Sequence, residues 1–203
     1  MISLPDLKLR VDESFKKIND PVYIQSILNN HPRVFTKTIW SKDLAYSLIP
    51  LGLECLGFKG SKYITKTPPK TSNMHVHKLI DDMIREVIVH DRAGQHVMTD
   101  YLYRDGNLGF ELSLDLNNTA EALTEVVYKD GKVISSLRVN NDKEFWYHEY
   151  VYVDNRIKQI ITRQYNSDSG KHVGVSHVDY IDNVVANIYY HYLGVKYNLY
   201  TYR

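Results

Sequence analysis

The sequence has little cysteine, no long apolar run and almost no net charge. Its single cysteine, Cys55, excludes an intramolecular disulfide and lies among the apolar neighbours Leu53 and Leu56, which indicates a buried rather than a reactive thiol. No stretch approaches the roughly 18 apolar residues that a membrane span needs, and the first ten residues lack a secretory signal pattern. We therefore expect a cytoplasmic protein without membrane contact.

The charges are balanced, with 25 Lys and Arg against 24 Asp and Glu in 203 residues. The resulting field is too weak to recruit nucleic acid or an acidic membrane by itself, so any charged surface must be local. What the chain does have is tyrosine, with 17 copies, most of them from Tyr101 onward. Tyrosine favours strands and packs well across them, which predicts a tyrosine-rich sheet in the C-terminal half.

Residues 1–90 are predicted to form a helical N-terminal region. Asp20-Pro21 supplies a capping residue and a first-turn proline for one of these helices, and Leu79, Met83 and Val87 form the strongest helical stripe in the chain. The polar stretch 59–73 contains Pro68-Pro69 and is predicted to be a linker. The apolar spacing predicts four helices, at residues 7–18, 21–30, 41–51 and 79–87.

Residues 91–203 are predicted to form an antiparallel sheet region that shares one core with the helices. Alternation of apolar and polar residues from Leu108 to Leu116 is typical of a strand with one buried face. Four similar turns then recur at spacings of 25, 24 and 28 residues, and each is predicted to be the tip of a hairpin with a two-residue loop of positive φ. The turns are Tyr103-Arg-Asp-Gly106, Tyr128-Lys-Asp-Gly131, Tyr152-Val-Asp-Asn155 and Tyr180-Ile-Asp-Asn183. Looser turns at 90–95 and 165–171 bring the expected number of strands to about eight to ten.

Residues 90–190 resemble, through these Tyr-x-Asp-Gly turns, the YD repeats of RHS-type proteins. The resemblance implies a tyrosine-rich antiparallel sheet, although two of the four turns carry Asn where the repeat has Gly. A small chain with helices, a meander sheet and no catalytic motif also resembles in style the immunity proteins that accompany polymorphic and contact-dependent toxins. That second resemblance carries over no individual residue.

No catalytic set, cofactor site or metal site is predicted. His75 and His77 could share an ion on a strand but not at the start of a helix, which is where the pattern places them. His148-Glu149 lacks the second histidine of a zinc-protease motif, because position 152 is Tyr. No glycine-rich phosphate loop and no nucleophile elbow occur.

The richest surface candidate is the segment from Phe145 to Arg163, which combines aromatic and basic side chains. Alternation puts Trp146, His148, Tyr150 and Tyr152 on one face of a strand and Tyr147, Glu149 and Val151 on the other. Aromatic and arginine enrichment is typical of protein interfaces and also of platforms for single-stranded nucleic acid. The predicted partner-binding residues are Trp146, Tyr150, Tyr152, Arg156, Lys158 and Arg163.

The fold class expected is α+β, with N-terminal helices packed against a C-terminal, twisted antiparallel meander of repeated hairpins. The leading hypothesis is a non-enzymatic protein that binds a cognate protein, specifically a bacterial immunity protein that neutralises its toxin. The alternatives are a nucleic-acid-binding module that uses the aromatic and basic sheet face, and a small enzyme whose site is not visible in sequence. Self-association through a free sheet edge would give a homodimer.

Overall fold

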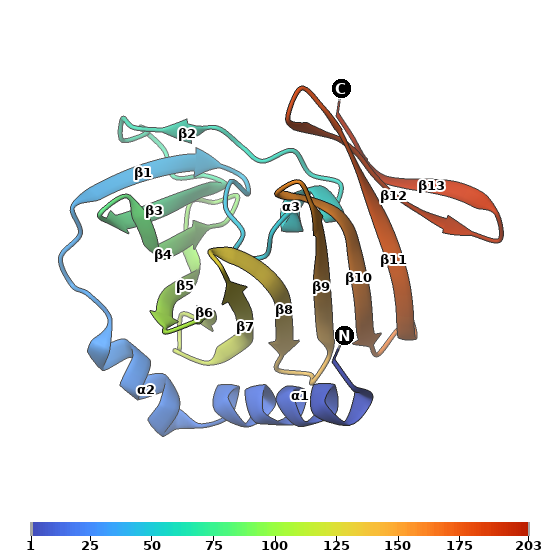
Figure 1. The fold of residues 1–203 in the computed structure, drawn as a ribbon. Coiled ribbons are helices and arrows are strands. Elements are labelled where there is room, and N and C mark those ends of the chain that lie inside the picture. Colours follow the sequence, from blue (N-terminus) through green and yellow to red (C-terminus); the bar gives the residue numbers. More distant parts are fainter. Residues whose placement is uncertain (1, 203) are drawn as a thin grey trace.

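The computed structural model describes residues 2–202 and has N-terminal helices packed against one large antiparallel sheet that does not close (Figure 1). The helices are α1 (Leu4–Ile18), α2 (Pro21–Asn30) and the single-turn α3 (Gly52–Cys55). The sheet is a meander of 13 strands in the order β13 to β3 and then β1 and β2. The first strands are β1 (Lys37–Lys42), β2 (Tyr63–Ile64), β3 (Met74–Ile80), β4 (Met83–His90), β5 (His96–Asp105), β6 (Leu108–Asp115) and β7 (Ala120–Lys129). They are followed by β8 (Lys132–Asn140), β9 (Phe145–Val153), β10 (Arg156–Asn166), β11 (Gly170–Ile181), β12 (Val184–Tyr192) and β13 (Val195–Thr201). The α+β prediction is confirmed.

The first two predicted helices are confirmed, and their caps match the sequence signals. The Ser3 side chain accepts a hydrogen bond from the Asp6 backbone N–H at the start of α1, and Asp20 does the same for Val22 at the start of α2. Both helices pack on one face of the sheet, which we call the outer face. There Phe15 and Ile18 meet the apolar row of β6, and Leu7 and Val11 meet β8 and β9. The predicted apolar row of β6 is confirmed as buried at Phe110, Leu112 and Leu114, whereas Leu116 lies beyond the strand and is 59% exposed. The residues that cover the row are on α1 and α2.

Two predicted helices are wrong. Residues 79–87 form the end of β3, a two-residue turn at Asp81-Asp82 and the start of β4. Of residues 41–51, Ser41 and Lys42 end β1 and the rest form no regular helix; the only helical turn nearby is α3. The sheet therefore begins at Lys37, and β4 pairs with β5 across residue 91. The stretch 59–73 is irregular apart from the two residues of β2, as its composition predicted.

The predicted hairpins are present, and their tips have the expected backbone. Both loop residues have positive φ in Asp130-Gly131, Asp154-Asn155 and Asp182-Asn183, which is the requirement of a type I′ turn. The first turn differs by one residue: Asp105 pairs with Leu108, so its loop is Gly106-Asn107 and only Gly106 has positive φ. Asp81-Asp82 and Leu193-Gly194 are further turns of the I′ kind that the repeat pattern did not reveal.

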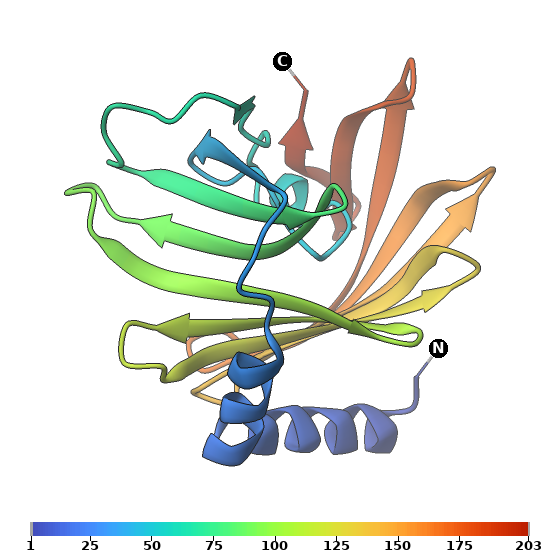
Figure 2. The same cartoon turned by 90° about the vertical axis from the view of Figure 1, so that its left-hand side faces the viewer.

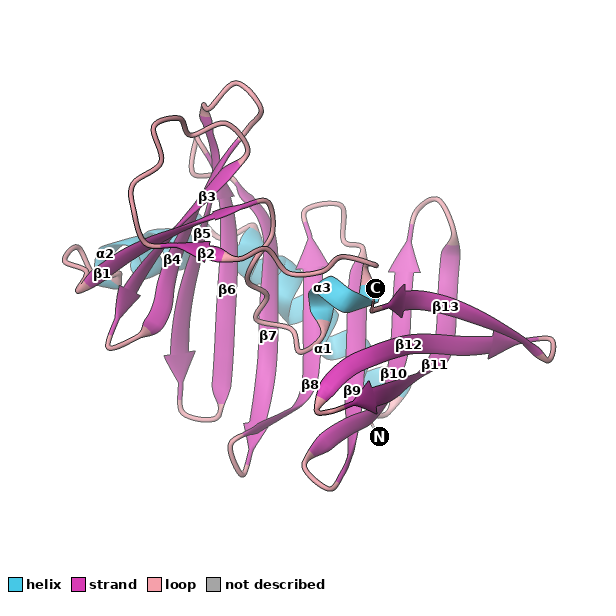
Figure 3. Cartoon of the chain, turned by 90° about the horizontal axis from the view of Figure 1, so that it is seen from above, coloured by secondary structure: helices cyan, strands magenta, loops and turns pink. Residues whose placement is uncertain are grey.

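The sheet curves around the irregular segment 43–58, which includes α3 (Figures 2 and 3). Leu48, Ile49, Leu51 and Cys55 of this segment pack against a second core on the inner face of the sheet, opposite α1. That core is formed by β7 to β13 and holds Val126, Val133, Tyr150, Ile157, Ile160, Val178, Ile188 and Tyr200. Burial raises the pKa of the Cys55 thiol to about 12, which agrees with an unreactive packing role.

Candidate partner-binding surface

The repeated tyrosines form a ladder along the hairpin tips with cations from neighbouring hairpins. Each cationic group lies 4.3–5.6 Å from the centre of the tyrosine ring of the next hairpin. Two of the cations also donate a hydrogen bond to the turn asparagine of that hairpin, Lys132 to Asn155 and Arg156 to Asn183. The pairs are Arg104 with Tyr128, Lys132 with Tyr152, and Arg156 with Tyr180. The repeat therefore ties adjacent hairpins together, at about 0.5–1 kcal/mol for each exposed cation–aromatic pair.

Trp146, Tyr150 and Tyr152, the three aromatic residues predicted to bind a partner, lie on the same face of β9, as the alternation predicted. That face is the inner face of the sheet. Tyr150 is 7% exposed in the inner core, and its hydroxyl lies 2.9 Å from that of Ser136. Tyr152 donates to the backbone carbonyl of Val133, and Trp146 pairs across the strands with Arg138. Tyr150 is therefore committed to the core, and Trp146 and Tyr152 are half-buried.

The three predicted basic residues lie elsewhere. Arg156 belongs to the tip ladder, and so does Lys158, a bulge residue of β10 whose ammonium lies 5.5 Å from the centre of the Tyr180 ring. Arg163 is on the outer face, where its guanidinium donates to the backbone carbonyl of Ile2. The six predicted residues are therefore not brought together on one surface.

The outer face of the C-terminal strands is not covered by the described helices. α1 packs on β7 and β8. The part of the outer face that the N-terminal segment covers ends at Ile2, whose backbone N–H donates a hydrogen bond to Glu149 and whose carbonyl accepts one from Arg163. Beyond that line the outer face exposes aliphatic side chains, which we call the valine patch: Val151 (37%), Val153 (49%), Val173 (68%), Val175 (41%), Ile181 (67%) and Val184 (49%).

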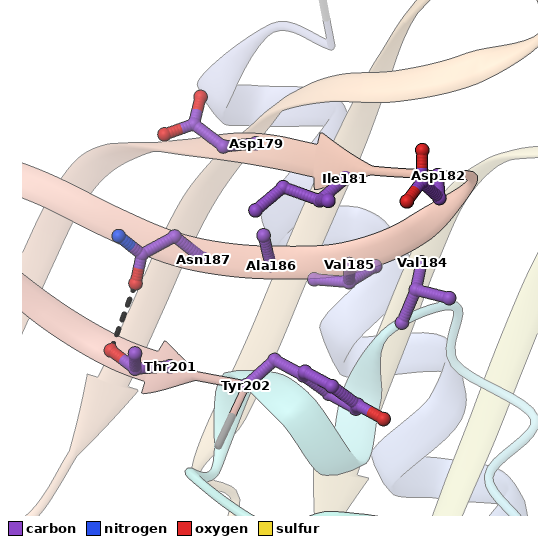
Figure 4. Close-up of a pocket in the computed structure, with 9 residues that line it drawn as sticks. All are labelled: Asp179, Ile181, Asp182, Val184, Val185, Ala186, Asn187, Thr201 and Tyr202. Atoms are coloured by element: carbon purple, nitrogen blue, oxygen red, sulfur yellow. Dashed lines mark hydrogen bonds between the residues drawn. The ribbon is translucent and has the colours of Figure 1, made fainter.

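Two open hollows lie on this face and share Asp179. One, of about 340 Å³, is lined by Val151 and Val153 and by Lys158 of the predicted set. The other, of about 610 Å³, lies beside Ile181 and Val184, where β11 ends and β12 begins, and extends to Tyr202 (Figure 4). Gln159, His177 and Asp179 lie between the aliphatic side chains of this face. Exposed apolar side chains gathered with a few polar groups are typical of a surface that binds another protein.

One aromatic and basic cluster lies among the residues of the valine patch, next to Val151 and Val175. The Tyr189 ring stacks on the His177 ring with centroids 5.4 Å apart, and the Lys196 ammonium lies 3.5 Å from the Tyr189 ring centre. His191 contacts both aromatic rings. Sequence alternation could not have found this surface, because β11 presents Val173 and Val175 outward and Gly174 and Ser176 inward, against the usual direction.

A pair of carboxyl groups lies on the inner face beneath the segment 43–58. Asp100 accepts a 2.6 Å hydrogen bond from Ser113, and Glu111 lies 3.6 Å from the Arg138 guanidinium and accepts a hydrogen bond from the Leu48 backbone. Burial, together with the negative charge of Asp100, raises the pKa of Glu111 to about 7. Burial also raises the pKa of Asp100. We assign the two carboxyl groups a structural role, because Glu111 accepts a hydrogen bond from the Leu48 backbone and so anchors the segment 43–58 to the sheet.

Among residues 2–202 no three or more His, Cys, Asp or Glu side chains are grouped so that they could hold a metal ion. His75 and His77 nevertheless lie on a strand and not at the start of a helix, so the reason given for separating them does not apply. Their geometry is treated below.

The comparisons with known proteins add no relative. The chain matches no protein-family model, no curated protein and no solved structure. In the part of the chain that the structure describes, none of the helices has the length and apolar character that crossing a membrane would take.

Proposed function

We propose that this protein is a non-enzymatic binding protein whose valine patch docks on another protein. The observation that carries the proposal is the exposure of six aliphatic side chains on strands β9, β11 and β12, on the face that α1 and α2 cover further along the same sheet. A rigid sheet that presents such a patch can bind without chemistry of its own. The specific role that we propose is that of a cytoplasmic immunity protein that neutralises a bacterial toxin, in line with the resemblance in style.

The expected hot spots are now on the valine patch and not in the inner aromatic row. Val175→Asp places a charge within the patch, between Val173 and His177 on the outer row of β11, and should weaken partner binding at least about tenfold, because a charge buried at an interface without a partner is costly. Val22→Asp is the matched control, because Val22 is an exposed valine on α2, distant in the chain from the patch.

The test uses the tagged full chain to capture a partner from its native host at high salt, followed by co-expression of that partner in a test strain. The immunity role predicts that the partner arrests growth alone, that the unsubstituted protein and Val22→Asp restore growth, and that Val175→Asp does not. Equal rescue by both variants would refute the placement on the patch. A harmless partner would refute the immunity role but leave protein binding standing.

Nucleic-acid binding is the second candidate, and the cluster of Tyr189, His177 and Lys196 favours it. Oligonucleotide binding through this cluster should weaken steeply as salt rises, because each neutralised phosphate releases a counterion. Binding that is insensitive to salt, or unchanged in Lys196→Ala, would exclude this role. Self-association is a separate proposal: β13 is a free edge, although Gly57 lies against Leu199 near its end. Sedimentation of the purified protein tests it.

A further inference from the structure

His75 and His77 lie two residues apart on β3, so both side chains project from its inner face. Across the ladder they pair with Ser41 and Ile39 of β1. Their ring centroids are 6.5 Å apart, and the Tyr63 and His77 rings make a T-shaped contact with centroids 5.1 Å apart. His77 is 1% exposed, whereas His75 is half-buried and lies closer to solvent.

Hydrogen bonds fix the protonation of His77. The Ser41 hydroxyl has one hydrogen, which it donates to the Asp43 backbone carbonyl at 3.1 Å. Ser41 Oγ must therefore accept from His77 Nε2, which is 2.8 Å away. Nδ1 of the neutral ring then carries a lone pair, and this atom is buried without a hydrogen-bond partner.

His75 presents a second atom of the same kind. Its Nδ1 is also buried and has no hydrogen-bond partner. The ring donates a hydrogen bond to the Asp43 backbone, so the proton lies on Nε2 and Nδ1 carries the lone pair. Burial lowers the pKa of both rings, that of His77 to about 4, so both stay neutral and able to act as metal ligands at neutral pH. Leaving two such lone pairs unpaired costs free energy, which a bound cation would recover.

The surroundings narrow the class of ion. A metal-binding imidazole characteristically donates its other N–H to a neighbouring oxygen, as His77 does to Ser41. The described residues offer two nitrogen ligands and no third side chain, and the burial of His77 leaves little space for the waters that Zn²⁺ or Ni²⁺ would need to complete four or more ligands. Monovalent copper accepts two ligands in a line. Metal–nitrogen bonds of about 2 Å would put the ring centroids roughly 6 Å apart, near the spacing observed.

We propose that His75 Nδ1 and His77 Nδ1 form a two-coordinate binding site for Cu⁺. The negative charge of Asp43, which acts on the His75 ring, offsets part of the charge of the ion. This site is on β1 and β3, at the opposite end of the sheet from the valine patch, and it does not depend on the proposed function.

The test is an anaerobic competition titration of the full chain with Cu⁺ held by a coloured chelator. We expect one ion per chain, and at least about tenfold weaker binding in His75→Gln and in His77→Gln, the range seen when a ligand or its supporting contact is lost. His172→Gln, at an exposed histidine of β11, should bind like the unsubstituted protein. Equal binding by all four proteins means an adventitious ion only and overturns the proposal.

A second measurement needs no substitution. In protein labelled with ¹⁵N at histidine, Cu⁺ should shift the Nδ1 signals of His75 and His77 and leave their Nε2 signals protonated. Shifts confined to other histidines would overturn the proposal even if the variants fail to fold. Stoichiometric binding of Zn²⁺ in place of Cu⁺ would overturn the two-coordinate assignment.

Discussion

The carboxyl of Glu111 should make the protein less stable as the pH rises, and Glu111→Gln should remove this effect. Burial beside Asp100 raises the pKa of Glu111 from its ordinary 4.5 to about 7. Between these two pH values the unfolded chain releases the proton while the folded chain keeps it. The stabilising contribution is therefore complete below pH 4.5 and is lost as the pH rises through 7.

The size of the effect follows from the shift. A difference of about 2.5 pH units corresponds to on the order of 3 kcal/mol, at roughly 1.4 kcal/mol per unit. The glutamine amide cannot ionise, and its oxygen can still accept the Leu48 N–H. The variant should therefore gain on the unsubstituted protein by on the order of 3 kcal/mol between pH 4.5 and 8; the attraction to Arg138 at 3.6 Å is already contained in the pKa of about 7.

The assay is urea unfolding of both proteins at half-unit pH steps, and the quantity compared is the difference between their free energies of unfolding. The two proteins are compared by difference because burial lowers the pKa values of His77 and His148 to about 4, and this makes the stability of each protein rise with pH, opposite to the effect of Glu111. Their contribution cancels between the two proteins. A difference that stays constant from pH 4.5 to 8 would refute the assignment of a buried, protonated Glu111.

Two further predictions concern groups outside the binding proposals. Glu125 is buried on β7 and accepts a hydrogen bond from Lys17 at 2.8 Å, and the Arg10 guanidinium lies 3.7 Å away. Glu125→Gln should therefore loosen α1 and lower the free energy of unfolding in urea by about 1–3 kcal/mol. Glu13→Gln, at an exposed position of α1, is the control, and equal stability of the two variants would contradict the anchoring role. His148 is half-buried, and its Nδ1 lies 3.0 Å from the Thr162 hydroxyl. Because desolvation lowers its pKa to about 4, it should titrate near pH 4 in a histidine NMR experiment, with its stabilising contribution present above pH 6.5 and lost as the pH falls through 4; a midpoint above 6 would contradict this desolvation.

The sequence contained enough information for the caps of α1 and α2, the strand β6 and the hairpin tips, because each depends on short-range chemistry. Asp20 before Pro21 makes a helix start wherever the helix packs, and Asp-Gly or Asp-Asn in a two-residue loop suits a type I′ turn. Alternation also placed Trp146, Tyr150 and Tyr152 on one face of β9. It could not say which face would be covered, because that depends on α1 and the segment 43–58, which are more than 80 residues away in the chain.

The candidate surface was missed for the same reason. Tyrosine next to arginine suggested an interface, but these side chains satisfy one another in the ladder at the hairpin tips. The valine patch has no unusual composition; its residues differ from core valines only in that nothing described lies over them.

The wrong helix at residues 79–87 has a physical origin in the same repeated hairpin. In four hairpins the third residue after the type I′ turn is an unpaired bulge, so the residues before and after it fall out of strict alternation. Inner-face side chains are then three residues apart: Ile84 and Val87, Val133 and Ser136, Ile157 and Ile160, Val185 and Ile188. A spacing of three is also the spacing of residues on one face of a helix. Around β4, Leu79 at the end of β3 and Met83 at the start of β4 extended this spacing into the apolar stripe that predicted a helix. The bulged residues are Arg85, Ile134, Lys158 and Ala186, which share no chemical character, so the bulge left no mark in the sequence. Because each bulge adds local twist, the repeat that misled the periodicity is also a cause of the curvature that wraps the sheet around the segment 43–58.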